Sequence, residues 1–363
     1  MIVAALLCAA GLPAGFLLMG KVRTPREAGT QTARSFSQGV SIIVPARNEE
    51  ENLPHLLASI ETECPDLQEV MVVDDASSDN TWAVAAAMGA RVVSSALLPS
   101  GWTGKTWALH QGVTASSGEL LLFLDADTFF ATGGLSALIA SYHQESRATQ
   151  AAHGIALSVL PFHIMQKPYE QLSLFFNLLM AIGAGGFGMF GRGRLFGQFL
   201  LISRELYQRS DGHEAVRGTI LENFAFAEHV RVAGGSCITM GGRGTLHVRM
   251  FPHGFRQLTE GWTKAFADGA AGSDPLILVV SIIWLTTLCG TFLTLMIEPS
   301  AIFAALYACF SLQLIWMTQP IGNFRWFTCF LYPIALVFYF VIFGQSLYLR
   351  TFKQQVAWSG RRV

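Results

Sequence analysis

Charged side chains are scarce in this 363-residue sequence: Asp, Glu, Lys and Arg together make up 13% of it, whereas 52% is hydrophobic. With a mean hydropathy of +0.42, this balance is too apolar for a purely soluble protein and indicates membrane segments. The formal net charge is −1, and no basic stripe stands out. We therefore expect a partner in membrane lipids and no nucleic-acid partner.

Cysteines are also few, and none is spaced as CxxC. A zinc site or a disulfide framework is therefore not expected, and reduced thiols in a cytosolic or membrane setting fit better. The six cysteines are Cys8, Cys64, Cys237, Cys289, Cys309 and Cys329.

Charge is absent from the first 20 residues, which are long enough to span roughly 30 Å of hydrocarbon. No basic segment precedes them, which argues against the alternative reading, a cleaved signal peptide. Lys21 and Arg23 follow this stretch. The positive-inside rule then predicts a multi-pass protein of the cell membrane whose next domain faces the cytoplasm.

Three further apolar stretches follow Pro275, over residues 276–297, 301–317 and 327–349, and the middle one is the weakest. Four spans in total would place the tail with Lys353 outside, against the positive-inside rule. One stretch could therefore be re-entrant or interfacial.

Between residues 40 and 141 the pattern alternates between short apolar runs, such as "VSIIVPA", "EVMVVDD" and "ELLLFLDAD", and helical segments. Continuous apolar strands that alternate with helices are typical of a parallel sheet covered on both faces, that is, an α/β fold. Ligands bind beyond the carboxyl ends of the strands in such sheets. Residues 150–272 are less regular. Within them, residues 169–190 could form a core helix, an interfacial helix or a lipid-facing groove.

Two aspartates, Asp125 and Asp127, end the apolar run in "LLLFLDADTFF". Residues i and i+2 of an extended strand point the same way, so both carboxylates can converge on one site. Each raises the pKa of the other unless a cation lies between them. Mg²⁺ and Mn²⁺ take oxygen ligands, often one or two carboxylates plus substrate phosphates. We therefore predict that this pair binds a divalent cation and a diphosphate, although such pairs also occur in ordinary turns.

Acidic residues end the preceding strands as well. Asp74 and Asp75 stand in "VVDDASSDNT", where helix capping is the alternative role. Carboxylates at a strand end can accept hydrogen bonds from a base or from ribose hydroxyls. Glu49 follows "IIVPARN", where the helix dipole alone could explain an acid.

The segments "SIIVPARNEEENL", "VVDDASSDNT", "GWTGKTWALHQG" and "LLFLDADTFF", in this order, resemble the inverting family 2 glycosyltransferases, which have a GT-A fold. The "PSGWTGKTWA" loop narrows the resemblance to membrane enzymes that glycosylate carotenoid or hopanoid-like lipids. The stretches "SVLPFHIMQKPYEQLSLFFNLL" and "VRMFPHGFRQLTEGWTKAFADGAAGS" resemble those of the 4,4'-diaponeurosporenoate glycosyltransferase type. The resemblance runs from about residue 40 to 358.

The resemblance implies a GT-A (Rossmann-like) domain with a mixed, mostly parallel sheet, plus transmembrane helices. We place the N-terminal transmembrane helix at 1–20 and the catalytic domain at 38–272, with a nucleotide-sugar half (40–141) and an acceptor half (150–272). About three transmembrane helices occupy 275–350.

The same resemblance implies roles for individual residues. Asp74 and Asp75 would hold the uracil or ribose, and Lys105 would lie beside the nucleotide. Asp125 and Asp127 would hold the metal and the diphosphate of a UDP-sugar. The residues lining the uridine pocket would be Pro45, Arg47 and Glu49.

The catalytic carboxylate of this resemblance falls at Glu222, with Asp127 as its partner in the catalytic set. Asn223 follows Glu222 where many members carry a second carboxylate, so either Glu222 is the base or no strong base is needed. A carboxylic acid acceptor is already ionised at neutral pH and needs no deprotonation.

Other residues complete the expected site. Basic side chains near the diphosphate would stabilise the leaving group, unless they are interfacial residues near anionic lipid. His247 is a possible third metal ligand, although we interpret the histidines mainly as structural. The candidates for contact with diphosphate or acceptor are Arg249, Arg256, Trp262 and Lys264.

We thus expect an enzyme that moves a hexose, glucose in the first instance, from a UDP-sugar to the carboxylate of a C30 carotenoid acid. Three alternatives stay open: transfer to another lipid (a hydroxylated isoprenoid, a polyprenyl phosphate or diacylglycerol), a processive polysaccharide synthase, and a non-catalytic nucleotide-sugar sensor. The absence of the Q-x-x-R-W box from "FRQLTEGWTKAF" disfavours the synthase.

Overall fold

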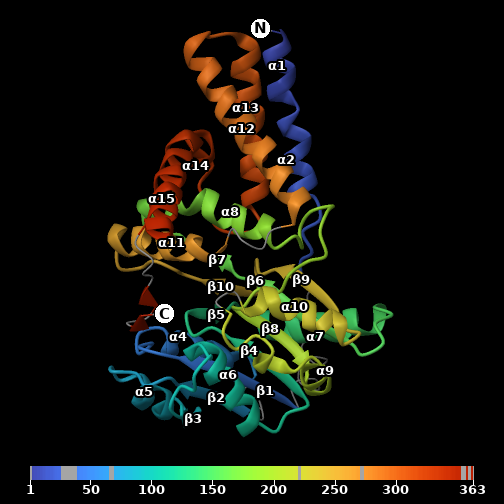
Figure 1. Ribbon diagram of the computed structural model, residues 1–363, viewed down its shortest axis with the longest axis vertical. Coiled ribbons are helices and arrows are strands. Elements are labelled where there is room, and N and C mark those ends of the chain that lie inside the picture. The colour runs from blue at the N-terminus through green and yellow to red at the C-terminus, as the bar shows by residue number, and fades with distance from the viewer. Residues whose placement is uncertain are drawn as a thin grey trace. The chain divides into compact units, whose positions relative to one another are not determined.

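The computed structural model describes residues 2–25, 39–64, 69–219, 222–269, 274–352, 357–358 and 361–362. The chain divides into two compact units, each assembled from segments distant in sequence. The sheet unit comprises Arg23–Phe162 and Gly193–Arg249, and the helical unit comprises Met1–Val22, His163–Arg192 and Met250–Val363. Figure 1 shows all the strands of the large sheet in the first unit and the long helices in the second.

A seven-stranded sheet with the order β3-β2-β1-β4-β8-β6-β9 forms the centre of the sheet unit. Neighbouring strands run parallel, except that β8 pairs antiparallel with both β4 and β6. The mixed, mostly parallel sheet predicted from the sequence is therefore confirmed. The strands are β1 (Val40–Ala46), β2 (Glu69–Asp74), β3 (Arg91–Ser94), β4 (Leu120–Leu124), β6 (Ile155–Leu160), β8 (Phe199–Ser203) and β9 (Ser236–Gly241).

Helices cover both faces of this sheet, which explains why its strands are apolar throughout. Alternate residues of β1 enter different cores: Ile42 packs with α4 and α7, and Ile43 packs with α6 and α10. Gly112 lets α6 approach closely, because a Cβ there would lie 2.4 Å from Ile43 Cγ2. The helices are α4 (Leu53–Glu63), α5 (Thr81–Ala87), α6 (Gly104–Ala115), α7 (Gly134–Ala148), α9 (Arg204–Arg209), η2 (Gly212–Glu214) and α10 (Glu222–Val232).

A short ribbon follows β4 and begins directly after Asp125 and Asp127. In it, β5 (Thr128–Phe130) pairs antiparallel with β10 (Leu246–Val248). The chain leaves the sheet unit at Phe162 in β7 (Phe162–His163).

The helical unit contains three helices that are long and apolar enough to cross a membrane: Pro275–Ile297, Ala301–Thr318 and Tyr332–Leu349. They support membrane association by length and composition. The elements of this unit are α1 (Ile2–Ala9), α2 (Gly11–Met19), η1 (Pro168–Ser173), α8 (Leu174–Gly183), α11 (Phe255–Gly269), α12 (Pro275–Ile297), α13 (Ala301–Thr318), α14 (Trp326–Phe330), α15 (Tyr332–Phe352), β11 (Ala357–Trp358) and β12 (Arg361–Arg362).

Where we expected one helix over residues 1–20, the structure has two, α1 and α2, and the apolar helical segment Ala5–Met19 is shorter than the three spans. Pro13 has no backbone N–H to continue the ladder, which explains the break. Gln313 Nε2 of α13 donates to the Leu12 carbonyl oxygen at 2.6 Å, which ties α2 to α13.

The stretch 169–190 forms η1 and α8 and an irregular continuation. Phe175 and Phe176 of α8 are fully buried, and their rings contact Trp284 and Trp262 of the same unit. Of the three readings left open, this burial favours a core helix of the helical unit. The orientation of the unit across a membrane stays a prediction, and Lys353 lies outside the described residues.

Candidate active site

The candidate site lies where β1, β2 and β4 end at one edge of the sheet. Ala46 at the end of β1 is in register with Asp74 at the end of β2. Pairing of β1 with β4 stops at Ile43, so these strands separate before Pro45, which has no N–H for a ladder. The residues that follow each strand can therefore face a ligand rather than a neighbouring strand.

Lys105 connects the metal-binding candidates to the catalytic candidate. Its Nζ lies 2.7 Å from Asp125 Oδ1 and 3.3 Å from Glu222 Oε1. Burial by itself would lower the pKa of Lys105, but the charges of Asp125 and Glu222 raise it, so the side chain is an ammonium ion. The structure thus brings together three residues that stand far apart in the sequence.

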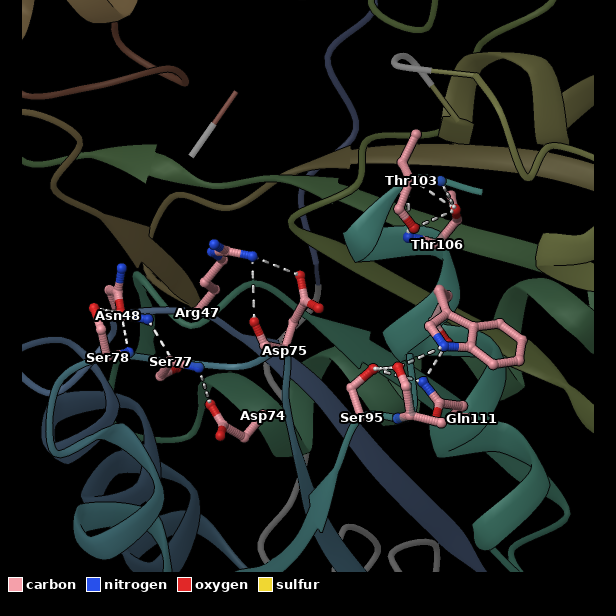
Figure 2. A network of polar contacts seen from close by, with 12 residues as sticks. Arg47, Asn48, Asp74, Asp75, Ser77, Ser78, Ser95, Thr103, Thr106 and Gln111 are labelled. Carbon is pink, nitrogen blue, oxygen red and sulfur yellow. Dashed lines mark hydrogen bonds and ion pairs between the residues drawn. The ribbon is translucent and has the colours of Figure 1, made fainter. Parts of the chain in front are cut away.

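Local structure explains why Lys105 is held there. Thr103 caps α6 through a reciprocal pair of bonds with Thr106, which places Lys105 in the first turn of the helix. The Thr103 N–H and the Thr106 hydroxyl both donate to the Arg217 carbonyl oxygen at 2.8 Å. The start of α6, shown in Figure 2, is therefore fastened to the segment that leads to Glu222.

Carboxylates crowd around Asp127. Burial, and then the charges of Asp125 and Glu49, raise the pKa of Asp127 to about 7. Burial also raises the pKa of Glu49, against a hydrogen bond from Asn52 that lowers it. Such a cluster is stabilised by a cation, and a divalent ion would remove the conflict among these charges.

The donor set fits a cation that takes two protein carboxylates and completes its shell with phosphate oxygens. No group of three or more His, Cys, Asp or Glu side chains is arranged around one point within the described residues. His247, considered as a third ligand, packs instead edge-on against Phe129, with ring centroids 5.4 Å apart. Burial lowers the pKa of His247, as expected for a packed, neutral ring.

The loops after β1 and β2 form the second part of the site (Figure 2). Arg47 Nη1 lies 3.6 Å from Asp75 Oδ2, and Asp75 is buried. Asp74 instead closes its own turn, since its Oδ1 accepts from the Ser77 N–H at 3.2 Å. Of the two aspartates expected to bind the base or ribose, Asp75 thus pairs with Arg47, and Asp74 accepts the hydrogen bond that closes its own turn.

Backbone strain marks the same loops. Asn48 and Ala76 have φ values of +58° and +54°. Asn tolerates this left-handed conformation, but Ala has a Cβ that opposes it. Strain of this kind persists where the surrounding structure enforces it, and it clusters at binding sites. The Asn48 side chain accepts a hydrogen bond from the Ser78 N–H at 2.8 Å, which ties the two loops together.

The remaining predicted residues lie elsewhere. Arg249 is the last residue of the sheet unit, whereas Arg256 and Trp262 belong to α11 of the helical unit. Arg256 is exposed and pairs with Glu260 at 2.8 Å. The Trp262 indole is fully buried and donates to Ser173 Oγ at 3.0 Å, so it is a packing group in this unit. The side chain of Lys264 lies outside those that the structure describes.

Two residues beside Glu222 were not among the predicted site residues. Asn223 Nδ2 donates to Glu222 Oε1 at 2.8 Å. Gly197 lies against this pair, because a Cβ there would be 2.5 Å from Asn223 Nδ2 and 3.3 Å from Lys105 Nζ. The sequence pointed to Asn223, because many members of the resembling family have a carboxylate at that position. Nothing in the sequence distinguished Gly197 from the other glycines in its glycine-rich stretch.

Comparison with known proteins agrees with this architecture. The model of glycosyl transferase family 2 matches residues 41–201. A 4,4'-diaponeurosporenoate glycosyltransferase of Staphylococcus aureus (strain N315) is 33% identical over 346 residues, which cover 92% of this chain and 90% of that protein. The protein of the same name from strain USA300 is 33% identical over 90% of this chain and 88% of its own.

Among solved structures, a mannosyltransferase from Pyrobaculum calidifontis, in complex with GDP-Man and Mn²⁺, aligns with a TM-score of 0.53 and 17% identity, covering 98% of this chain and 99% of its own. This likeness shows the fold, and the GT-A prediction is confirmed. The relatives at 33% identity, together with the family model, establish that the chain is a glycosyltransferase and belongs to glycosyltransferase family 2.

Proposed function

We propose that this enzyme is an inverting hexosyltransferase that moves glucose from UDP-glucose to the carboxylate of an apolar carotenoid acid, 4,4'-diaponeurosporenoate, to give a glycosyl ester. The name of the relatives that share most of the chain length supports this acceptor. The observation that carries the proposal is the position of Lys105. It lies between Asp125, the candidate ligand of the cation and the sugar diphosphate, and Glu222, the candidate catalytic carboxylate.

The donor half of the site would bind the nucleotide sugar. Asp75, held by Arg47, would accept hydrogen bonds from the uracil or ribose. Asp125 and Asp127 would hold Mg²⁺ or Mn²⁺, which when bound offsets the negative charge that develops on the leaving UDP. Lys105 would supply a further positive charge beside the diphosphate.

The acceptor half needs little acid–base chemistry if the acceptor is a carboxylic acid. Such an acid has a pKa of roughly 4 to 5 and is ionised at neutral pH. Its oxygen would attack the anomeric carbon, the bond from that carbon to the diphosphate oxygen would break, and the electron pair would leave with UDP. No proton is transferred, so Glu222 need not act as a base; through its ion pair it would instead hold Lys105 in place.

We also propose that the enzyme is a multi-pass protein of the cell membrane with its sheet unit in the cytoplasm. Three helices of membrane-spanning length and composition support membrane association. Lys21 and Arg23, which follow the first apolar stretch, favour the cytoplasmic orientation. An acceptor too apolar for water would then reach the site from the bilayer.

The proposal is tested with the purified full chain in liposomes, labelled UDP-glucose and the carotenoid acid, followed by mass analysis of the product. Asp125→Asn and Asp127→Asn should each lower transfer at least about 1000-fold, since both remove a ligand of the cation. Asp211→Asn is the matched control, because Asp211 is exposed with a φ of +57° that asparagine also tolerates. Full activity in EDTA would contradict the metal role.

A second candidate function, transfer to a lipid hydroxyl, is favoured by the presence of Glu222 itself. An alcohol must lose its proton as it attacks, and a positioned carboxylate contributes about 100- to 10,000-fold to such a step. Glu222→Gln decides between the two. A modest loss of turnover supports the carboxylate acceptor, whereas a loss of several thousandfold supports the alcohol.

A further inference from the structure

Two donors converge on one oxygen of Glu222. Asn223 Nδ2 lies 2.8 Å from Oε1, and Lys105 Nζ lies 3.3 Å from the same atom. An ionised carboxylate only accepts hydrogen bonds, so the amide must present its nitrogen, not its oxygen, to Glu222. The environment beside the candidate catalytic carboxylate is therefore one of donors, built from a neutral amide and an ammonium ion.

Gly197 leaves room for these two donors. A Cβ on Gly197 would lie 2.5 Å from Asn223 Nδ2 and 3.3 Å from Lys105 Nζ, so a side chain there would displace the amide and crowd the ammonium. Both nitrogens therefore lie close to the backbone of Gly197, in space that a side chain at this position would occupy. Asn223 is buried, which keeps its amide in place.

Lys105 has donor capacity to spare. An ammonium has three N–H groups, and its ion pairs within the described residues are with Asp125 and Glu222. Its side chain is 31% exposed, against 10% for Glu222, so an incoming ligand can reach the ammonium more easily than the carboxylate. Asn223 likewise uses one of its two amide hydrogens on Glu222.

We propose that Asn223 is a specificity-determining residue, which together with Lys105 holds the carboxylate of an anionic acceptor beside Glu222 and so selects acids over alcohols. This inference rests on the proposed function and names the group that sets its acceptor class. An aspartate at position 223 would place a second negative charge within hydrogen-bond distance of Glu222 and would repel an acceptor that arrives as an anion. The neutral amide avoids that repulsion and offers a hydrogen-bond donor instead.

The reaction at such a subsite balances without a base. The acceptor oxygen forms its bond to the anomeric carbon while the bond to the diphosphate oxygen breaks, and the charge that the acid brought leaves on UDP. The wild-type ratio of kcat/KM for the acid to that for the alcohol should therefore not rise with pH above the acceptor's own pKa, roughly 4 to 5, because effects of pH on cation binding at Asp127 are common to both acceptors.

The test compares Asn223→Asp with the wild type on two acceptors of the same chain, the carotenoid acid and the corresponding primary alcohol. We expect kcat/KM for the acid to fall on the order of 100-fold in the variant, because juxtaposed like charges cost several kcal/mol, while the alcohol is used as well as before or better. Lowering the pH should move the variant's ratio of acid to alcohol use back towards the wild-type ratio measured at the same pH, which a purely structural defect would not do. Asn223→Ser, which removes the amide without adding charge, should raise KM for the acid alone.

Asn80→Asp is the matched control, since the exposed Asn80 amide also donates to a glutamate, Glu50, at 2.9 Å. It should leave the ratio of acid to alcohol unchanged. An unchanged ratio in Asn223→Asp, or an equal loss on both acceptors, would overturn the role of Asn223 and leave the proposed function intact. A wild type that glycosylates the alcohol and not the acid would overturn the proposed acceptor class together with this inference.

Discussion

Replacing Lys105 by methionine should destabilise the sheet unit measurably when no metal is present. Methionine keeps an unbranched apolar stem of similar length but removes the charge. Asp125 and Glu222 would then face each other, with Asp127 and Glu49 near, and no ammonium between them.

The magnitude follows from two distances. At an effective dielectric constant of about 20, charges 2.7 Å and 3.3 Å apart attract by about 6 and 5 kcal/mol before desolvation is counted. Desolvation offsets most of this: breaking a buried pair costs about 3–5 kcal/mol, and an exposed one about 0–1 kcal/mol. With 31% of its side chain exposed, Lys105 lies between these cases, so we expect a loss of about 2–3 kcal/mol.

Thermal unfolding of the full chain in detergent, with EDTA present, measures the effect. A loss of this size corresponds to a fall in Tm of about 4–12 °C for a unit of roughly 150–250 residues. Arg91→Met is the matched control, because Arg91 pairs with Glu69 at 3.0 Å while 58% of its side chain is exposed, and its loss should cost less than about 1 kcal/mol. Equal shifts in the two variants would refute the view that Lys105 neutralises the carboxylate cluster.

Two further predictions concern residues away from the chemistry. Trp262→Ala should destabilise the helical unit by about 3–5 kcal/mol, because the indole is fully buried against Phe176, and Trp262→Phe should lose much less; a small effect of the alanine in thermal unfolding would contradict a packing role. Burial acts to raise the pKa of Glu69, but hydrogen bonds from Ser41, Ser117 and Arg91 lower it overall below its ordinary value of 4.5. The ionised Glu69 side chain therefore stabilises the fold above pH 4.5, and this effect is lost as the pH falls through the folded-state pKa. On acidification below pH 4.5, the Tm of Glu69→Gln should fall less steeply than the Tm of the wild type. Parallel Tm–pH curves for the two proteins would refute this.

Periodicity in the sequence was sufficient to predict the α/β architecture. Short apolar runs between helical segments can be buried only in a sheet covered on both faces, and the acidic residues after β2 and β4 then had to lie at one edge. These are consequences of local pattern, since each strand and the residue after it are adjacent in the chain. The long apolar helices α12 and α13 were predictable for the same reason.

The breaks in the apolar helices and the reversed direction of β8 were harder to predict from the sequence. Proline marks the start of α2 and α15, yet whether it bends a long helix or divides it depends on which neighbours replace the lost hydrogen bond. The antiparallel insertion of β8 between β4 and β6 depends on pairing between segments about 40 to 80 residues apart, for which no local pattern carries a signal.

The functional consequence of the fold shows the same division. The sequence by itself determined which residue types were available: paired aspartates at a strand end, a lysine in the "GWTGKTWA" segment and a glutamate followed by asparagine. Only the tertiary structure decided that Lys105 reaches both Asp125 and Glu222, that the backbone of Gly197 lies close to Lys105 and Asn223, and that Trp262 is buried as a packing group. The reason is physical, because distances between side chains are set by the packing of distant helices and strands, while a sequence pattern reports only which face of its own element a residue occupies.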